Sequence, residues 1–384
     1  MNAPLRVLHI GNGAAFKIRA IVDSQAARGY DVHMMPIPAS SVTWPNVTVH
    51  PLPPSKLPGK LKVFAGFFAI RRLVNELRPD VVHAHNAWGP GWYGAASGHH
   101  PFFIHAYGGD LLPEQYVGRP ALQRWLTSWA CRSADHVIVT GRHMVQASGG
   151  LGLDPARVVL LPRGVDSQLF RPGLDVSELR TRLGIAPDAN VILSPRYQVD
   201  ESLYNLDIII DAFAAARRRH PGLVCVQMYD PARTAGIERL RARARAAGLG
   251  TDYLLTPAVD NAHMPVYYNL ADIVVSVPSS DGFPVTVLEA SACARAMIVS
   301  NLAYTSEWFT QRANGVVIPP GDTTALENAL DELLVDAPAR QRMGAAARAQ
   351  VMERADYQRC MQKLDGLYRE SLPANDGRTK ALSN

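Results

Sequence analysis

The segment DIVVSVPSSDGFPVTVLEASACA, residues 272–294, predicts a buried strand, a tight turn and a helix in direct succession. Its first part is a short apolar run rich in β-branched residues, which favours a strand covered on both faces. Pro284 follows the turn where the first helical turn begins, and proline fits there because its missing N–H has no helical partner to lose. A strand that passes through a short turn into a helix is the repeating unit of parallel α/β sheets.

The same alternation of apolar strands and helical patterns continues through most of the chain. Strand patterns include LRVLHI, DVVHAH, FFIHAYG and DHVIVT in the first half, and NVILSPR, GLVCVQMY, DYLLTP and AMIVSN in the second. Strands that alternate with crossover helices predict parallel sheets with helices on both faces. A chain of 384 residues also exceeds what one hydrophobic core usually organises. We therefore predict the α/β class, with two Rossmann-like, doubly wound domains facing each other across a cleft.

Prolines and glycines in PRGVDSQLFRPG, near residue 170, interrupt the periodicity and predict a linker. We place an N-terminal domain at residues 1–168 and a second domain at residues 169–355. A strong helical pattern over about residues 337–371 predicts one long amphipathic helix, whose last part, residues 356–372, lies beyond the second domain. The polar end, residues 373–384, has no apolar period, so we expect it to be disordered.

Composition narrows the classes of function. The net charge of +5 is spread along the chain, which suits acidic small ligands or headgroups and lacks the clustering typical of a nucleic-acid module. The four cysteines form no C-x-x-C pair, which argues against zinc or a disulfide framework and favours a reducing cytoplasm. The longest apolar window, VFAGFFAI, is shorter than the roughly 18 residues that span a bilayer. We expect a cytoplasmic protein with no signal peptide and no transmembrane segment.

A glycine loop, IGNGAAF, follows the first predicted strand. Gly11 and Gly13 allow the backbone to approach a ligand closely, as at the start of a dinucleotide fingerprint. The third glycine is missing, because Phe16 occupies its place, and no acid ends the second strand. The loop therefore favours a nearby ligand and argues against a nicotinamide or flavin dehydrogenase.

Other polar side chains also stand at predicted strand ends, where open parallel sheets bind ligands. His83 and His85 end one strand, and His105 ends the next. A core role and a cleft role are both open for them, and the glycine-rich turns that follow favour the cleft. The chain has no H-E-x-x-H motif and no carboxylate at ligand spacing, so we expect no metal. Arg196 directly follows another strand, where an arginine can bind a phosphate with two hydrogen bonds.

The opening segment itself predicts an anion site. The free backbone N–H groups of Gly282, Phe283 and Val285 would point at a ligand from the start of the helix. Asp281 precedes the helix and Glu289 lies within it, so the two carboxylates can reach different parts of one ligand. A nucleotide sugar, with a pyrophosphate between two hydroxylated groups, fits this arrangement.

In combination, these pieces resemble glycosyltransferase family 4, the retaining enzymes with the GT-B fold, over nearly the whole chain. The matching pieces occur in the family's order: IGNGAAF, AARGYDV, DVVHAHN, HAYGGD, ADHVIVT, PRGVDSQLF, YYNLADIVVSVPSSDGFPVTVLEA and NGVVIPPGDTTALENAL. The resemblance implies a donor site on the C-terminal domain and an acceptor site on the N-terminal domain. It also implies that residues 356–372 form a helix that crosses back to the N-terminal domain.

The resemblance assigns roles to individual residues. Glu289 would accept hydrogen bonds from the nucleotide ribose, and Asp281 would contact hydroxyls of the transferred sugar. His105 matches the family's active-site histidine, and Arg196 matches the arginine that steadies the diphosphate. Gly13 and the helix start, residues 282–285, would complete the donor site.

The sequence departs from the family pattern at several positions. Asp281 stands where the family has the longer glutamate, and Pro284 replaces a common glycine. Tyr204 lies near the position of an expected lysine, so one phosphate-binding cation is lost. The stretch SNLAYTSEW keeps the acid Glu307 but lacks the usual glycine pair before it.

Four further residues are candidates for contacts with the acceptor or the phosphate. Lys17 or Arg19, in the glycine loop and the helix after it, could replace the missing lysine. His85 and Asp110 are the other two, and they lie in the matched pieces DVVHAHN and HAYGGD.

The resemblance implies a glycosyltransferase that retains anomeric configuration, with a nucleoside-diphosphate sugar as substrate and neither a cofactor nor a metal. Two alternatives stay open: a catalytically silent sugar-nucleotide-binding protein and a GT-B epimerase that acts on the sugar nucleotide. The expected acceptor is a carbohydrate or a lipid-linked sugar in surface polysaccharide or glycolipid assembly, with no nucleic acid involved. Residues 53–78 combine basic residues with phenylalanines, so we expect either peripheral contact with the inner face of the membrane or an ordinary crossover helix.

Overall fold

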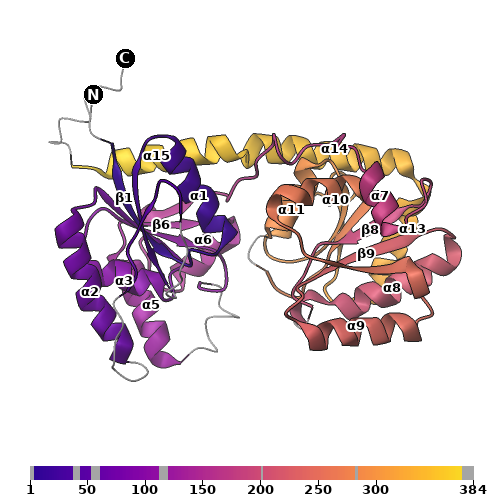
Figure 1. Ribbon diagram of the computed structural model, residues 1–384, viewed down its shortest axis with the longest axis horizontal. Helices are drawn as coiled ribbons and strands as arrows, with labels where there is room; N and C mark the ends of the chain where they lie inside the picture. Colours follow the sequence, from indigo (N-terminus) through magenta and orange to yellow (C-terminus); the bar gives the residue numbers. More distant parts are fainter. Residues whose placement is uncertain are drawn as a thin grey trace, which may run out of the picture. The chain divides into compact units, whose positions relative to one another are not determined.

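The computed structural model describes residues 4–37, 44–52, 61–111, 120–199, 202–281 and 284–373. The chain divides into two compact units, one of residues 1–162 with 359–384 and one of residues 163–358 (Figure 1). Gly282 and Phe283, residues 53–60 of the predicted membrane segment and most of the predicted disordered tail lie outside the described residues.

The first unit is built on a seven-stranded parallel sheet with the strand order β3-β2-β1-β4-β5-β6-β7. Helices pack on both of its faces (Figure 1), and the central strands β4 and β5 are buried along their whole length. The strands are β1 (Arg6–Gly11), β2 (Asp31–Pro36), β3 (Thr48–Val49), β4 (Val81–His85), β5 (Phe102–Ala106), β6 (His136–Val139) and β7 (Val158–Leu160). The helices are α1 (Phe16–Ala27), α2 (Leu61–Leu77), α3 (Pro90–Ser97), α5 (Ala121–Ser133) and α6 (Arg142–Gly149).

The second unit repeats this plan with a six-stranded parallel sheet in the order β10-β9-β8-β11-β12-β13. The strands are β8 (Val191–Ser194), β9 (Val224–Tyr229), β10 (Tyr253–Pro257), β11 (Ile273–Ser276), β12 (Ala296–Ser300) and β13 (Val316–Ile318). The helices are α7 (Ser177–Leu183), α8 (Leu206–Arg219), α9 (Thr234–Ala246), α10 (Met264–Leu270), α11 (Val285–Ala292), α12 (Thr305–Trp308), α13 (Thr323–Val335) and α14 (Ala337–Arg354). The predicted α/β class, with two doubly wound parallel sheets, is therefore confirmed.

The predicted single long helix near the end of the chain is wrong. The structure ends α14 at Arg354 and begins α15 (Tyr357–Ser371) three residues later. Between them the backbone pairs with Val165, whose N–H donates to Ala355 O at 2.9 Å and whose carbonyl accepts from Tyr357 N at 3.0 Å. The helical sequence pattern continues across this break. Local pattern cannot predict the break, because it depends on hydrogen bonds to Val165, which is distant in the sequence.

None of the described helices is both long enough and apolar enough to cross a bilayer.

Candidate functional site

The predicted phosphate-binding arginine lies at the carboxyl ends of two neighbouring strands in the second unit. Arg196 follows β8 and Asp281 follows β11, and these strands pair in parallel. Their carboxyl ends therefore lie at the same edge of the sheet. The Arg196 guanidinium donates from Nη2 to Asp281 Oδ2 at 2.7 Å. The structure thus joins two of the predicted site residues directly.

Arg196 is held from several sides. Its guanidinium carbon lies 5.0 Å from the ring centroid of Tyr204, which is within the range of a cation–π contact. Gln227 Nε2 donates to its backbone carbonyl at 2.6 Å. Burial disfavours the charged form most strongly of any single effect, but Asp281, Tyr204 and Tyr304 together outweigh it and raise the pKa of Arg196. The side chain is therefore a fixed, permanently charged cation.

Tyr204, at the position of the expected lysine, supplies no positive charge. Its hydroxyl donates to Gln198 Oε1 at 2.6 Å, and its ring supports Arg196. Where the family has a second cation, this chain has an aromatic ring that packs against the guanidinium of Arg196. The residue type alone gave no sign of this contact.

Helix α11 begins one residue later than the proline position predicted. Pro284 is the N-cap residue, with φ −71° and ψ 133°, and the first helical residue is Val285. An extended ψ at the N-cap is normal, since the cap residue stands outside the helix. Among the described residues, no side chain accepts a capping hydrogen bond from the first N–H groups of this helix.

Glu289 lies on the buried face of α11 and is only 4% exposed. Asn261 Nδ2 donates to its Oε1 and Tyr268 Oη donates to its Oε2, both at 2.8 Å. Burial raises the pKa of Glu289, while these two hydrogen bonds act in the opposite direction. The carboxylate is thus held in one orientation by two residues that the sequence did not single out. Asn261 is distant in sequence, and Tyr268 lies in a matched piece without any distinguishing spacing.

Glu307, the acid kept in the unusual stretch of residues 300–308, forms an ion pair inside the second unit. Arg354 Nη2 donates to Glu307 Oε1 at 3.1 Å, and Arg354 Nη1 donates to the Glu307 carbonyl at 2.7 Å. The same guanidinium lies 4.3 Å from the ring centroid of Trp308. These contacts join α12 to α14.

In the first unit, the predicted histidines lie side by side in the sheet. His83 and His85 on β4 and His105 on β5 are all buried, and His85 pairs in register with His105. The rings of His83 and His105 are nearly parallel, with centroids 5.8 Å apart. A further histidine, His9 on β1, completes the group and was missed, because only the pairing of β1 with β4 brings it close.

The remaining candidates in the first unit have mostly structural contacts. A side chain at Gly11 would place its Cβ 2.9 Å from His85 Cβ, so this glycine makes room for the histidine. Asp110 is buried and accepts hydrogen bonds from the N–H groups of Ala87, Tyr107 and Gly108, which fixes the turn after β5.

The glycine loop supplies the last candidates. Gly13 is buried in the loop after β1. Arg19 lies with its guanidinium carbon 5.1 Å from the Trp44 ring centroid, and the side chain of Lys17 lies outside the described residues.

Two family models match consecutive parts of the chain. The model described as Glycosyl transferase 4-like domain matches residues 12–164, and the model described as Glycosyl transferases group 1 matches residues 175–350. A D-inositol 3-phosphate glycosyltransferase from Acidothermus cellulolyticus is 25% identical across 96% of this chain and 88% of its own length. A protein of the same description from Xylanimonas cellulosilytica is 26% identical across 84% of both chains.

Solved structures resemble the chain over nearly its whole length. Sucrose-phosphate synthase from Thermosynechococcus elongatus matches with a TM-score of 0.80 and 19% identity, across 95% of this chain and 98% of that one. Anabaena Alr3699/HepE in complex with UDP and glucose matches with a TM-score of 0.79 and 17% identity, across 94% and 99%. At these identities the likeness concerns the fold.

Proposed function

Because the chain belongs to glycosyltransferase family 4 and has the GT-B fold, we propose that it moves a sugar from a nucleoside-diphosphate sugar to a hydroxyl acceptor with retention of configuration. The observation that carries this proposal is the Arg196–Asp281 pair at the ends of β8 and β11, next to the start of α11. A diphosphate would bind Arg196 and the first N–H groups of α11. Glu289 would accept hydrogen bonds from the ribose.

The proposed chemistry follows from where charge develops. The bond between the anomeric carbon and the diphosphate oxygen breaks, so negative charge grows on the β-phosphate. Arg196 and the N–H groups at the start of α11 would stabilise that charge without reorganising. The acceptor oxygen bonds to the anomeric carbon on the same face, and its proton passes to the departing phosphate.

This route requires neither a protein nucleophile nor a metal ion at the diphosphate. Asp281 would bind hydroxyls of the transferred sugar, and the proposed roles of His105 and Gly13 rest on the family resemblance.

The relatives indicate which donors and acceptors to test first. Solved structures that share the fold include complexes with UDP and with UDP-glucose, so UDP-sugars are the first candidates for the donor. The relatives described as D-inositol 3-phosphate glycosyltransferases suggest a phosphorylated polyol as one acceptor. A lipid-linked sugar in surface polysaccharide or glycolipid assembly is the other acceptor class that we propose.

Turnover of sugar nucleotides tests the proposal. We expect the purified protein to release nucleoside diphosphate slowly from one of a panel of UDP-, GDP- and ADP-sugars, and faster when an acceptor is added. The variant Arg196→Ala should lose about ten- to a hundredfold in rate, because a charge-assisted hydrogen bond is worth roughly 1.5–3 kcal/mol. Arg239→Ala is the matched control, since Arg239 pairs with Asp207 on the outer helices of the same unit.

Other outcomes of the same assay decide against a transferase. Inversion at the sugar C2 without an acceptor would identify an epimerase. Binding without any turnover would identify a silent sugar-nucleotide-binding protein.

Undiminished turnover by Lys17→Ala and Arg19→Ala would remove the hypothesis that one of these cations replaces the missing lysine.

Exposed aromatic side chains support a peripheral membrane contact in the first unit. Phe64 and Phe68 on α2 are 46% and 76% exposed, and Trp125 on α5 is 59% exposed. The two helices are neighbours, because the Phe67 and Trp129 rings lie 6.2 Å apart between them. The phenylalanines of the predicted segment are therefore not all core residues, and we propose that they enter the inner leaflet with the basic residues nearby.

Flotation with anionic vesicles tests this contact. We expect the protein to float with the vesicles and the double variant Phe68→Ser, Trp125→Ser to stay in solution. Val335→Ser is the control, because Val335 on α13 in the other unit is 75% exposed. A wild-type protein that does not float, or a double variant that floats equally well, would end the membrane proposal.

A further inference from the structure

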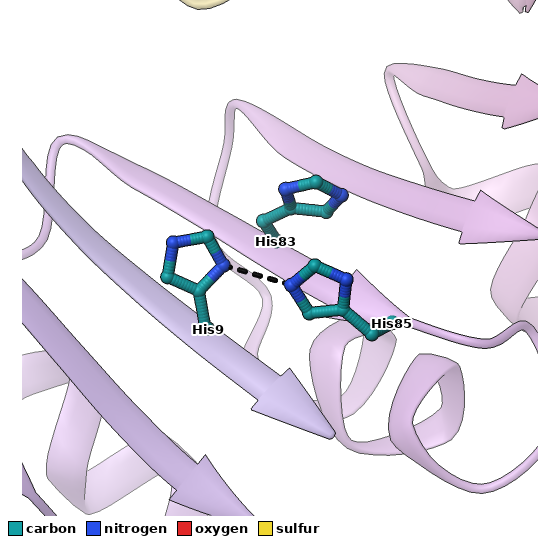
Figure 2. A group of neighbouring side chains, drawn as sticks. All are labelled: His9, His83 and His85. Atoms are coloured by element: carbon teal, nitrogen blue, oxygen red, sulfur yellow. Dashed lines mark hydrogen bonds between the residues drawn. The ribbon is translucent and has the colours of Figure 1, made fainter. Parts of the chain in front are cut away.

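Three buried histidines converge on one face of the first unit's sheet. His83 and His85 lie two residues apart on β4, so their side chains point to the same face. His9 on the adjacent strand β1 pairs in register with His83 and shares that face. One ring nitrogen from each histidine lies within 4.8 Å of the others (Figure 2).

The outer ring nitrogens of two of these histidines are held by neighbouring side chains. His9 Nε2 lies 2.7 Å from Gln25 Oε1, and His85 Nδ1 lies 2.9 Å from the Tyr107 hydroxyl. Gln25 Oε1 can only accept, so His9 carries its proton on Nε2 and directs a lone pair from Nδ1 toward His85. The inner nitrogens, His9 Nδ1 and His85 Nε2, are 2.9 Å apart, as the dashed line in Figure 2 shows.

His83 supplies the observation that points to a ligand. Its Nδ1 is hydrogen-bonded to the Tyr368 hydroxyl of α15, while its Nε2 is buried and has no hydrogen-bond partner among the described residues. Native proteins seldom leave a buried polar atom unsatisfied.

We propose that His9, His83 and His85 bind a divalent transition-metal ion, with Zn²⁺ as the expected ion. Metal-bound histidines typically have the other ring nitrogen fixed by an outer partner, and each of these three has one. Tetrahedral zinc with bonds of about 2.0–2.1 Å needs nitrogens roughly 3.3 Å apart. His9 Nδ1 and His85 Nε2, 2.9 Å apart, are already near this separation, and His83 lies within 4.8 Å of both.

The binding step balances without an added acid or base. The ion accepts three lone pairs, from His9 Nδ1, His83 Nε2 and His85 Nε2. His85 gives up the proton on Nε2 and takes one on Nδ1, which then donates to the Tyr107 hydroxyl, so every ring stays neutral. A fourth position remains for water or another small ligand.

The donor set decides the class of ion. It consists of imidazoles, and the candidate group contains no carboxylate or thiolate within the part of the chain that the structure describes. Imidazole ligands suit Zn²⁺, Cu²⁺, Ni²⁺ and Co²⁺, whereas Mg²⁺, Ca²⁺ and Mn²⁺ prefer oxygen. The site belongs to the first unit, whereas the proposed diphosphate contacts on Arg196 and α11 belong to the second. A test of metal binding is therefore independent of a test of the transfer reaction.

Metal titration of the chelator-treated protein tests the proposal. We expect the full chain to bind one Zn²⁺ by calorimetry and elemental analysis, and its melting temperature to rise with Zn²⁺ concentration. Co²⁺ should give the absorption bands of a tetrahedral site in the unaltered protein. His83→Asn and His85→Asn should each weaken Zn²⁺ binding at least tenfold.

The chain offers a matched control in the same unit. His33 and His50 form a pair with Nδ1 and Nε2 2.9 Å apart but are not part of the candidate group. His50→Asn should therefore bind Zn²⁺ like the wild type. Less than one Zn²⁺ per chain, loss of binding in His50→Asn, or Co²⁺ spectra without tetrahedral bands would overturn the proposal. The Co²⁺ spectrum decides the matter even if the variants at His83 and His85 fail to fold.

Discussion

The side chain of Arg196 is fixed by Asp281 and Tyr204, so the diphosphate that we propose as its ligand would compete with one carboxylate. Tyr204 does not compete, because its ring supports the guanidinium without neutralising it. With tyrosine in place of the family's lysine, the proposed diphosphate contact would depend on Arg196, and it would strengthen if Asp281 turned from Arg196 to the sugar.

Asp281→Asn should separate binding from turnover. Removing the competing charge frees Arg196, so the nucleoside diphosphate should bind at least about threefold more tightly, because this mostly buried ion pair is worth no less than an exposed one. Transfer should still fall roughly ten- to a hundredfold, because the sugar loses its charged partner. Calorimetry with the diphosphate and turnover of the sugar nucleotide measure the two effects. Asp252→Asn, which breaks the Arg217 pair in the same unit, should change neither.

Glu289 predicts a pH-dependent difference in stability. Burial raises its pKa above the ordinary 4.5, so the folded protein holds this proton more tightly than the unfolded chain. The stability that the carboxyl contributes is therefore present below about pH 4.5 and is lost as pH rises through the folded pKa. Glutamine does not titrate, so the melting temperature of Glu289→Gln minus that of the wild type should increase from about pH 4 to about pH 7. A difference that stays constant over this pH range would contradict this.

At the residue scale, the sequence identified polar side chains that follow a strand or lie at the start of a helix. It selected Arg196, Asp281 and Glu289 from their places beside a strand or at a helix start. It missed Asn261 and His9, because their relevance depends on contacts between segments far apart in the chain.

Helices and strands follow from local pattern more faithfully than their ends do. Apolar runs predicted where the strands lie, because a strand buried on both faces consists mostly of apolar residues. Local pattern failed at the break between α14 and α15, where hydrogen bonds to Val165 replace helical ones. It also placed Pro284 in the first turn of α11, although the residue occupies the N-cap position just before the helix.

The packing of α14 gives a sharp test at the level of the element. A methyl group at Gly344 would overlap the backbone carbonyl of Ala294, which cannot move aside as a flexible side chain would. Gly344→Ala should destabilise the second unit by about 1–3 kcal/mol, as overpacking usually does. Gly366→Ala on α15 is the control, because nothing lies within 4 Å of its added methyl group. Alanine should stabilise that helix by roughly 0.5–1 kcal/mol. Urea unfolding of both variants measures the difference, and equal stabilities would contradict the packing described.

The architecture of the whole molecule follows from the alternation of strands and helices through the chain. Two series of parallel strands, separated near residue 170, predicted two doubly wound sheets, and both are present. The family followed from motifs in a fixed order. Donor base, transferred sugar and acceptor did not follow, because they depend on a few contacts that differ among enzymes with one fold.

A crystal structure of the protein soaked with UDP, GDP or ADP tests the central claim most directly. The account predicts a diphosphate bound to Arg196 and to the N–H groups at the start of α11, with ribose hydroxyls donating to Glu289. A nucleotide bound elsewhere, with Arg196 still paired to Asp281, would contradict it.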